Sequence, residues 1–327
     1  MLRALSIHPM QSAAPAAIAA FVLSGAAGAV HAQDVAPPDA GLRTAVMLDS
    51  TYRVEHGVTY LHASGRDQKL DIYYHRRPDA PRAPVVLNFH GGGWVAGDRE
   101  SRAMTLLPWL QMGFAVVNVQ YRLGNVALAP AAVEDTLCAL QWVGRHADQY
   151  RFDLDRVVTT GDSAGGHLAL ATAMIPADSP LTNQCAATEP TWSGPYRNSA
   201  PKVAAVVNWY GITDVADMLQ GPNTRSYAVA WFGALPGRDA LARELSPLNH
   251  VRAGGPAVYT IHGDADKLVP YAHGVRLRTA LDKAGVRNVL HTVRDAGHGG
   301  FSAEQRLEIY TGVQAFLRQQ NILPAAR

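Results

Sequence analysis

Five continuous apolar runs, separated by stretches with helical periodicity, constrain the fold of this chain more than any other feature. Runs of this kind are typical of strands that are buried on both faces of a parallel sheet. Their spacing leaves room for a helix between successive strands, and such βαβ units place helices on both faces of the sheet. We therefore predict an α/β protein with a mostly parallel central sheet. The runs are residues 85–89, 114–119, 157–160, 203–209 and 257–261.

Weaker patterns complete the expected fold. Apolar and polar residues alternate over 52–61 and 69–74, which predicts two antiparallel strands before the parallel part of the sheet. Residues 288–293 fit a last strand and residues 303–319 a last helix. With 327 residues and 48% hydrophobic content, the chain can bury one large core, so we expect one globular domain over 50–327.

The N-terminal segment differs in composition from the rest. Arg3 is the only Lys, Arg, Asp or Glu in residues 1–32, and an apolar middle leads to small residues near Ala32. This pattern predicts a signal peptide over 1–32, cleaved after Ala32, and a periplasmic or secreted protein without a membrane anchor. The apolar run is shorter than the ~20 residues that a membrane span requires. Residues 33–49 are rich in Pro, Ala and Asp and are expected to form a flexible lead-in.

Charge and cysteine content exclude several classes of function. The 29 Lys and Arg residues nearly balance 27 Asp and Glu residues, without a basic block, so no nucleic-acid partner is indicated. Two cysteines, Cys138 and Cys185, are too few for a cysteine metal centre, and no close histidine pair indicates a metal site. After export the two thiols can form a disulfide, although Cys138 fits a buried apolar position equally well.

The segment Gly161-Asp162-Ser163-Ala164-Gly165 fits the pattern GxSxG and lies between a buried strand and a helical stretch. Small residues allow a sharp turn from strand to helix, which presents the serine oxygen at the edge of the sheet. The helix N-terminus beneath it favours negative charge. Ser163 is therefore the candidate nucleophile.

A glycine-rich loop, His90-Gly91-Gly92-Gly93-Trp94, follows the first buried strand. Glycines let backbone N–H groups approach a substrate closely, and fixed donors stabilise the negative oxygen of a tetrahedral intermediate. We expect the N–H groups of Gly92, Gly93 and Ala164 to form an oxyanion hole.

A serine nucleophile requires a base and an acid that orients the base. His298 and the pair Asp264 and Asp266 follow the last two strands, so they lie at the same sheet edge as Ser163. We assign His298 as the base. Asp264 and Asp266 share one turn, and either carboxylate could face the histidine. In related sequences that this chain resembles, the acid stands just before a segment such as Lys267-Leu268-Val269-Pro270, so we choose Asp266 and interpret Asp264 as a turn residue.

Residues 211–251 leave the edge of the sheet at which α/β proteins bind ligands, so they are expected to form at most a small cap. We expect Trp94, Tyr210 and Trp231 to contact the substrate, with Tyr227 and Phe232 as further candidates. Aromatic residues are nonetheless buried more often than they contact ligands.

Together these motifs resemble α/β-hydrolase carboxylesterases, most closely the branch of hormone-sensitive-lipase-like esterases and the BD-FAE, or feruloyl-esterase-like, family. The resemblance covers nearly all of residues 33–327 and rests on HGGGW, GDSAGG, HGDADKLVP and GHGGF. It implies hydrolysis of short-chain or aromatic esters, or of an esterified polysaccharide, through an acyl-enzyme on Ser163 without metal or cofactor. The absence of a helical N-terminal cap favours the feruloyl-esterase-like branch.

Three other functions are compatible with parts of the pattern. An amide hydrolase similar to kynurenine formamidase shares the HGGxW loop, but a signal peptide argues against it. A serine peptidase similar to prolyl oligopeptidases would need a large N-terminal region. A binding protein without catalysis would be expected to lack part of the triad, and every member is present here.

Overall fold

The computed structural model describes residues 39–187 and 200–323, and its described part contains one sheet in the order β1-β2-β4-β3-β5-β6-β7-β8. β1 pairs with β2, and β2 with β4, in antiparallel fashion, and the other neighbours are parallel. The predicted α/β fold with an antiparallel start is confirmed. The strands are β1 Tyr52–Ala63, β2 Arg66–His75, β3 Ala83–Phe89, β4 Ala115–Val119, β5 Phe152–Asp162, β6 Val203–Trp209, β7 Ala257–Gly263 and β8 Asn288–Val293.

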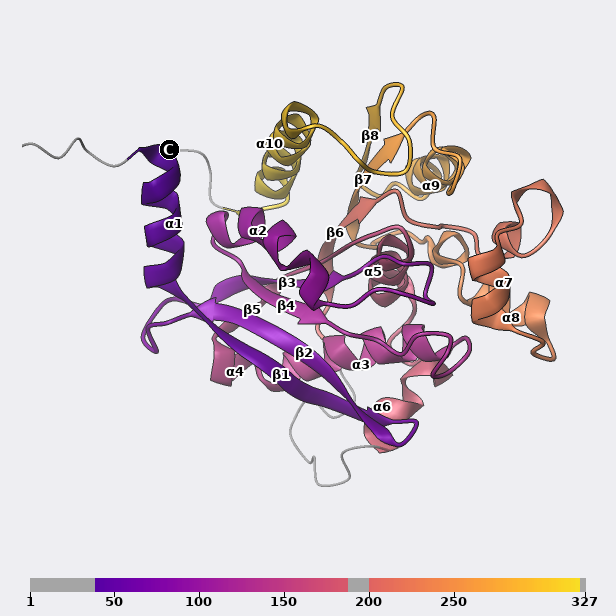
Figure 1. Cartoon of the computed structure of the whole chain (residues 1–327), viewed down its shortest axis with the longest axis horizontal. Coiled ribbons are helices and arrows are strands. Elements are labelled where there is room, and N and C mark those ends of the chain that lie inside the picture. The colour runs from indigo at the N-terminus through magenta and orange to yellow at the C-terminus, as the bar shows by residue number, and fades with distance from the viewer. Residues whose placement is uncertain (1–38, 188–199, 324–327) are drawn as a thin grey trace, which may run out of the picture. The chain divides into compact units, whose positions relative to one another are not determined.

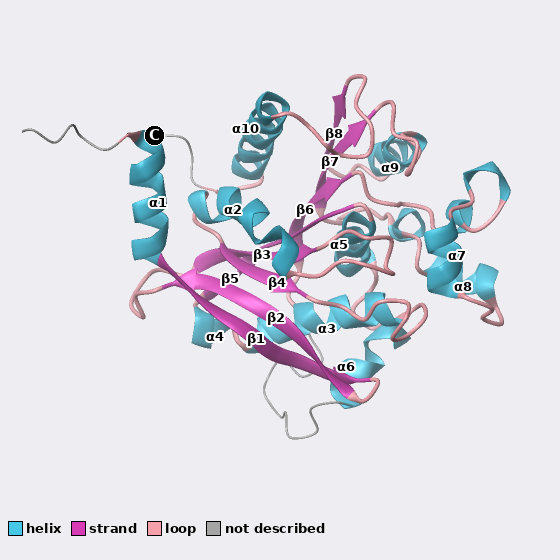
Figure 2. Ribbon diagram, viewed as in Figure 1, coloured by secondary structure: helices cyan, strands magenta, loops and turns pink. Residues whose placement is uncertain are grey.

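Helices cover both faces of this sheet (Figures 1 and 2). On one face α3 and α5 pack against the strands, and on the other face α2 and α10 do. Side chains along β3 alternate between the two faces: Val85 and Leu87 belong to the first core, and Val86 to the second. The main helices are α2 Leu107–Gln111, α3 Ala131–Arg145, α4 Ala147–Tyr150, α5 Ala164–Met174, α6 Asn183–Ala187, α9 Ala272–Lys283 and α10 Ala303–Gln319.

The predicted cap over 211–251 is small. It consists of three short 3₁₀ turns and the helices α7 Ser226–Phe232 and α8 Arg238–Glu244. Figure 1 shows α7 and α8 on the side of α5, away from α10. The two sides of the sheet edge therefore differ, since the cap helices accompany only one of them.

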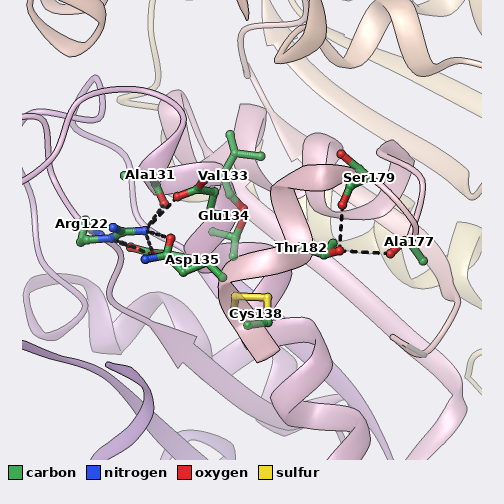
Figure 3. Close-up of a disulfide and its surroundings, with 12 residues drawn as sticks. Arg122, Ala131, Val133, Glu134, Asp135, Cys138, Ala177, Ser179 and Thr182 are labelled. Atoms are coloured by element: carbon green, nitrogen blue, oxygen red, sulfur yellow. Dashed lines mark hydrogen bonds and ion pairs between the residues drawn. A yellow bond between two sulfur atoms is a disulfide. The ribbon is translucent and has the colours of Figure 1, made fainter. Parts of the chain in front are cut away.

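A disulfide connects α3 to α6, and a buried ion pair connects α3 to the segment after β4. Cys138 in α3 is bonded to Cys185 in α6, which settles the open question on these cysteines (Figure 3). Arg122, which follows β4, binds the buried Asp135 through its backbone N–H and through its guanidinium, with Nε 2.9 Å from Oδ1. A buried charge is costly without such a partner, so the pair holds the start of α3 against the end of β4.

One expectation about the N-terminal region is corrected. Residues 33–49 were expected to be a lead-in without regular structure, but Ala40–Thr51 forms α1. After Gly41 this segment contains no glycine or proline and several good helix formers, and the side chain of Leu48 packs against the core on the α10 side. The signal peptide predicted over 1–32 lies outside the described residues, as do residues 33–38. None of the described helices is long and apolar enough to cross a bilayer.

Candidate active site

Ser163 stands on a sharp turn between the end of β5 and the start of α5. Its φ of 55° and ψ of −118° lie outside the regions that non-glycine residues prefer. The flanking glycines make the turn feasible: a Cβ on Gly161 would overlap the carbonyl oxygen of Gly165, and one on Gly165 would overlap that of Phe89. Such strain is maintained only where the surrounding structure imposes it, and it exposes the serine hydroxyl at the sheet edge.

Ser163, His298 and Asp266 form one hydrogen-bonded chain. His298 Nε2 lies 2.8 Å from Ser163 Oγ, and His298 Nδ1 lies 2.7 Å from Asp266 Oδ2. The three residues come from loops after β5, β8 and β7, which end at the same edge because these strands are parallel. The structure thus brings together the three residues assigned from sequence, at distances that permit proton transfer.

The carboxylate of Asp266 is fixed from several directions. Its Oδ1 accepts hydrogen bonds from the backbone N–H groups of Leu268 and Val269, at 2.8 and 3.0 Å. The buried His262 places its Nε2 3.3 Å from Asp266 Oδ2 and 3.0 Å from the carbonyl oxygen of Val269. Burial opposes ionisation of Asp266, but the hydrogen bonds to His262 and His298 outweigh it and hold its pKa well below the usual range. Asp266 is therefore ionised at neutral pH.

Asp264 occupies a different position in the same turn. Its Oδ1 accepts the backbone N–H of Asp295 at 2.7 Å, which ties the β7 loop to the β8 loop. This agrees with its interpretation as a turn residue rather than as the acid of the triad. The backbone N–H groups after Asp266, which bind its carboxylate, distinguish the two aspartates.

The glycine-rich loop has the backbone geometry of an oxyanion hole. Gly92 and Gly93 have φ values of 116° and 61°, and a Cβ on Gly92 would overlap the carbonyl oxygen of Ala96. Within the described part of the chain, the N–H groups of Gly92, Gly93 and Ala164 donate to no protein acceptor. Three free donors close to a nucleophile are suited to hold an oxygen that becomes negative.

Asp162 connects this loop to the nucleophile turn, a role that the sequence analysis missed. Its Oδ1 accepts the N–H of Gly91 at 3.1 Å, and its Oδ2 lies 3.0 Å from Arg102 Nη1. The signal available in the sequence was the acidic residue directly before Ser163. Arg102 carries no such signal, because it lies in the irregular segment η1 (Glu100–Leu106) after the loop.

The predicted substrate contacts fall into two groups. Trp94 and Trp231 are 0% exposed and stack on each other, with centroids 4.2 Å apart, so neither offers a surface to a substrate. Trp94 Nε1 donates to the buried His167 Nδ1 at 3.1 Å, and burial lowers the pKa of His167 to about 4, which keeps it neutral. These two tryptophans support the glycine loop from within the core. Phe232 is buried as well.

Tyr210 and Tyr227 lie nearer to the chemistry. The ring of Tyr210 packs edge-on against His298, with centroids 4.7 Å apart, and Tyr210 lines a cavity together with Asp162. Half-buried Tyr227 lies beside Gly93, where a Cβ on that glycine would come within 2.8 Å of its side chain. The tyrosines thus flank the site, one at the base and one at the oxyanion loop.

No ligating cluster accompanies the triad. Among residues 39–187 and 200–323, no group of three or more His, Cys, Asp or Glu side chains could hold a metal ion. The chemistry that the described residues offer is nucleophilic attack by a serine, proton transfer by a histidine and stabilisation of an oxyanion.

Comparison with known proteins gives consistent results. The chain is 28% identical to esterase LipQ of Mycobacterium tuberculosis strain H37Rv, over 72% of this chain and 55% of the relative. It is 30% identical to the probable carboxylic ester hydrolase LipM of the same organism, over 63% of this chain and 47% of the relative. The chain thus spans about half the length of these curated relatives.

Solved structures are similar over a larger share. A truncated carbohydrate esterase from gut microbiota is 26% identical, with a TM-score of 0.67 over 83% of this chain and 97% of that one. Esterase 2 of Thermogutta terrifontis, phosphorylated by paraoxon, is 25% identical, with a TM-score of 0.66 over 84% of this chain and 96% of that one. The BD-FAE family model matches residues 70–281, which is more than half of the chain. Because of this match and the shared fold, the chain belongs to the BD-FAE family of α/β-hydrolase carboxylesterases.

Proposed function

We propose that this protein is a serine carboxylesterase that hydrolyses short-chain or aromatic esters through an acyl-enzyme on Ser163. The observation that carries the proposal is the hydrogen-bonded chain from Asp266 through His298 to Ser163, beside three unpaired backbone N–H donors. Nucleophile, base, acid and oxyanion donors are the complete set for acyl transfer. The similarity to proteins described as esterases supports the same reaction.

In the first half of the reaction, His298 Nε2 takes the proton of Ser163 Oγ while Oγ forms a bond to the ester carbonyl carbon. The carbonyl π electrons move to the oxygen, which becomes an oxyanion held by the N–H groups of Gly92, Gly93 and Ala164. Ionised Asp266 stabilises the imidazolium that His298 becomes. The carbon–oxygen bond to the alcohol then breaks, and the imidazolium proton passes to the leaving oxygen.

In the second half, water replaces the alcohol. His298 takes one proton from the water while the water oxygen attacks the acyl carbon, and the same three donors hold the second oxyanion. Cleavage of the bond to Ser163 Oγ releases the carboxylic acid, and the proton on His298 returns to the serine. Every step uses side-chain and backbone groups of this chain together with water.

A hydrolysis panel on the purified protein tests the proposal. It contains p-nitrophenyl acetate, butyrate and decanoate, methyl ferulate, acetylated xylan and N-formylkynurenine, each measured also with Ser163→Ala. We expect serine-dependent turnover of the short or aromatic esters. Acetylated xylan is included because a carbohydrate esterase is among the similar structures. Selective turnover of N-formylkynurenine, or turnover that Ser163→Ala retains, would contradict the proposal.

We also propose that the chain is exported and cleaved after Ala32. The disulfide between Cys138 and Cys185 supports this, because disulfides persist in oxidising compartments and are rare in the cytosol. N-terminal sequencing of the protein recovered from periplasm and medium is expected to begin at Gln33. Full-length protein found in the cytoplasm would contradict export.

A further inference from the structure

A cavity of about 170 Å³ opens on the α10 side of the sheet edge, next to the nucleophile turn. Asp162, which directly precedes Ser163, lines it, as does Tyr210, whose ring packs against His298. Gly300, two residues after His298, also lines it. The cavity therefore adjoins the triad on the side of the histidine, and the cap helices α7 and α8 lie on the opposite side (Figure 1).

The size and walls of this cavity suit one aromatic ring. An engineered apolar cavity of about 150 Å³ in another protein is large enough for benzene. Here the walls include the half-buried side chains of Trp209, Phe301 and Tyr310. Aromatic rings prefer offset or edge-on contacts with other rings, and this cluster, in which Trp209 packs on both Phe301 and Tyr310, offers several ring surfaces. A planar aromatic group is thus the best match for the apolar part.

Two arginines give the cavity an excess of positive charge. Arg102, with a side chain 48% exposed, forms an ion pair with Asp162, so these two charges largely cancel. Arg306, in the first turn of α10, is exposed and makes no ion pair with any residue that the structure describes. The charged residues that line the cavity are Arg102, Asp162 and Arg306, so the guanidinium of Arg306 has no compensating charge among them. A guanidinium binds a carboxylate through paired hydrogen bonds.

The position of the cavity indicates which half of an ester enters it. The leaving alcohol must receive its proton from His298 Nε2, so the alcohol half lies on the histidine side of Ser163. Tyr227, which lies against Gly93 of the glycine loop, is not among the residues that line the cavity. Since Tyr210 and Gly300 belong to the histidine side, the cavity receives the alcohol half.

We propose that this cavity binds the alcohol half of the ester and favours an aromatic alcohol that carries a carboxylate, which Arg306 recognises. The inference rests on the proposed esterase activity and narrows its substrate class. Its products are a free carboxylic acid and a hydroxyaryl carboxylate. Arg306 acts here as a binding residue, without part in proton transfer.

Two matched esters test the inference. 4-Acetoxybenzoate carries the carboxylate on the leaving phenol, and methyl 4-acetoxybenzoate is its neutral counterpart. The quantity measured is the ratio of kcat/KM for the anionic ester to kcat/KM for the neutral ester. Because each protein variant is assayed on the same two esters, differences in their intrinsic reactivity cancel when variants are compared.

Arg306→Gln is expected to lower this ratio about fivefold, the upper end of what an exposed ion pair contributes. Arg306→Lys, which keeps the charge, is expected to retain most of the ratio. The matched control is Arg278→Gln on α9, which removes an exposed arginine (58% exposed) outside the cavity and is expected to leave the ratio unchanged. High salt should lower the ratio of the unaltered protein, because it screens exposed charges.

The outcomes separate this inference from the proposed function. Serine-dependent hydrolysis of both acetates with the same ratio in Arg306→Gln and in the unaltered protein would overturn the inference and leave the esterase intact. An equal fall in Arg278→Gln would also overturn it, because net charge alone would then explain the effect. A charge preference seen only between monomethyl and dimethyl terephthalate, whose carboxylate is on the acyl half, would overturn the assignment to the alcohol half. No hydrolysis by any variant would overturn the proposed function itself.

Discussion

The two sides of Ser163 are built in opposite ways. On the side of the glycine loop, Trp94, Trp231 and His167 are fully buried; Trp94 donates a hydrogen bond to His167 and stacks on Trp231. On the side of His298, a cavity is lined by half-buried aromatic rings and exposed arginines beside the buried rings of Trp109 and Tyr210. The closed side fixes the proposed oxyanion donors, whose function requires rigid geometry. The open side leaves room for variable groups, so we attribute specificity to it.

The largest loss of activity is expected from a change at His298, which lies at the boundary between the two sides. His298→Ala removes the base that both sides depend on and should reduce kcat by at least about 10⁴-fold, as typical triad removals do. Steady-state kinetics with p-nitrophenyl acetate measures this loss. Retained activity in a variant with an unchanged thermal melting curve would show that another group is the base.

On the closed side, Trp231→Ala tests the support of the glycine loop. Removal of a fully buried indole leaves a cavity under Trp94 and is expected to lower the free energy of unfolding by about 3–5 kcal/mol. Urea denaturation measures this difference. Phe301→Ala, on the half-buried wall of the open side, should cost less than half as much; equal losses would remove the contrast between the two sides.

Gly92→Ala tests the geometry of the oxyanion loop directly. A Cβ at this position would overlap the carbonyl oxygen of Ala96 and displace the donor, so we expect kcat to fall by about 10²–10³-fold. Gly57→Ala is the control, since that glycine also has a positive φ, 66°, but has open space around it. If both variants lose activity equally, backbone strain rather than the position of the donor is responsible.

Much of the fold was predictable because the relevant signals are local. The strands over 203–209 and 288–293 and the helix over 303–319 have the bounds that the apolar pattern predicted. The members of the triad could be assigned because each follows a buried strand, and parallel strands bring such positions to one edge. The choice of Asp266 depended on the segment after it, whose N–H groups bind its carboxylate.

Other features depend on distant parts of the chain. Trp94 and Trp231 were expected to contact substrate, but they bury each other although 137 positions separate them, and no local pattern shows that. Arg102 and Arg306 meet at one cavity only because η1 and α10 lie on the same side of the sheet edge. The helix α1 was missed because a Pro- and Ala-rich stretch precedes it.

The pH dependence of stability should report on the closed side. Burial lowers the pKa of His167 to about 4, whereas an unfolded chain binds this proton near pH 6.5. Between pH 4 and 6.5 the unfolded state binds more protons than the folded state. The contribution of neutral, buried His167 to the free energy of unfolding is therefore complete above pH 6.5 and is lost as the pH falls to 4. The stability advantage over His167→Gln should shrink by about 3 kcal/mol across this range.

Urea denaturation at pH 7, 5.5 and 4.5 measures that difference. A constant difference between His167→Gln and the unaltered protein would mean that His167 is protonated as readily in the folded state as in the unfolded state.

The smallest change in stability is expected from a substitution of Arg102, at the mouth of the open side. Arg102→Gln breaks the half-exposed ion pair with Asp162, which should change the free energy of unfolding by at most about 1 kcal/mol. Urea denaturation measures this change. A loss as large as that of Trp231→Ala would show that the open side is as rigid as the closed one.

The central claim is that Ser163, held by His298 between these two sides, is the nucleophile. Its most direct test is peptide mass spectrometry of the protein after reaction with paraoxon, which phosphorylates a similar esterase of known structure. The account predicts one diethyl phosphate adduct, on the peptide that contains Ser163, and no adduct in Ser163→Ala. An adduct on another residue, or none under conditions in which the protein hydrolyses esters, would contradict it.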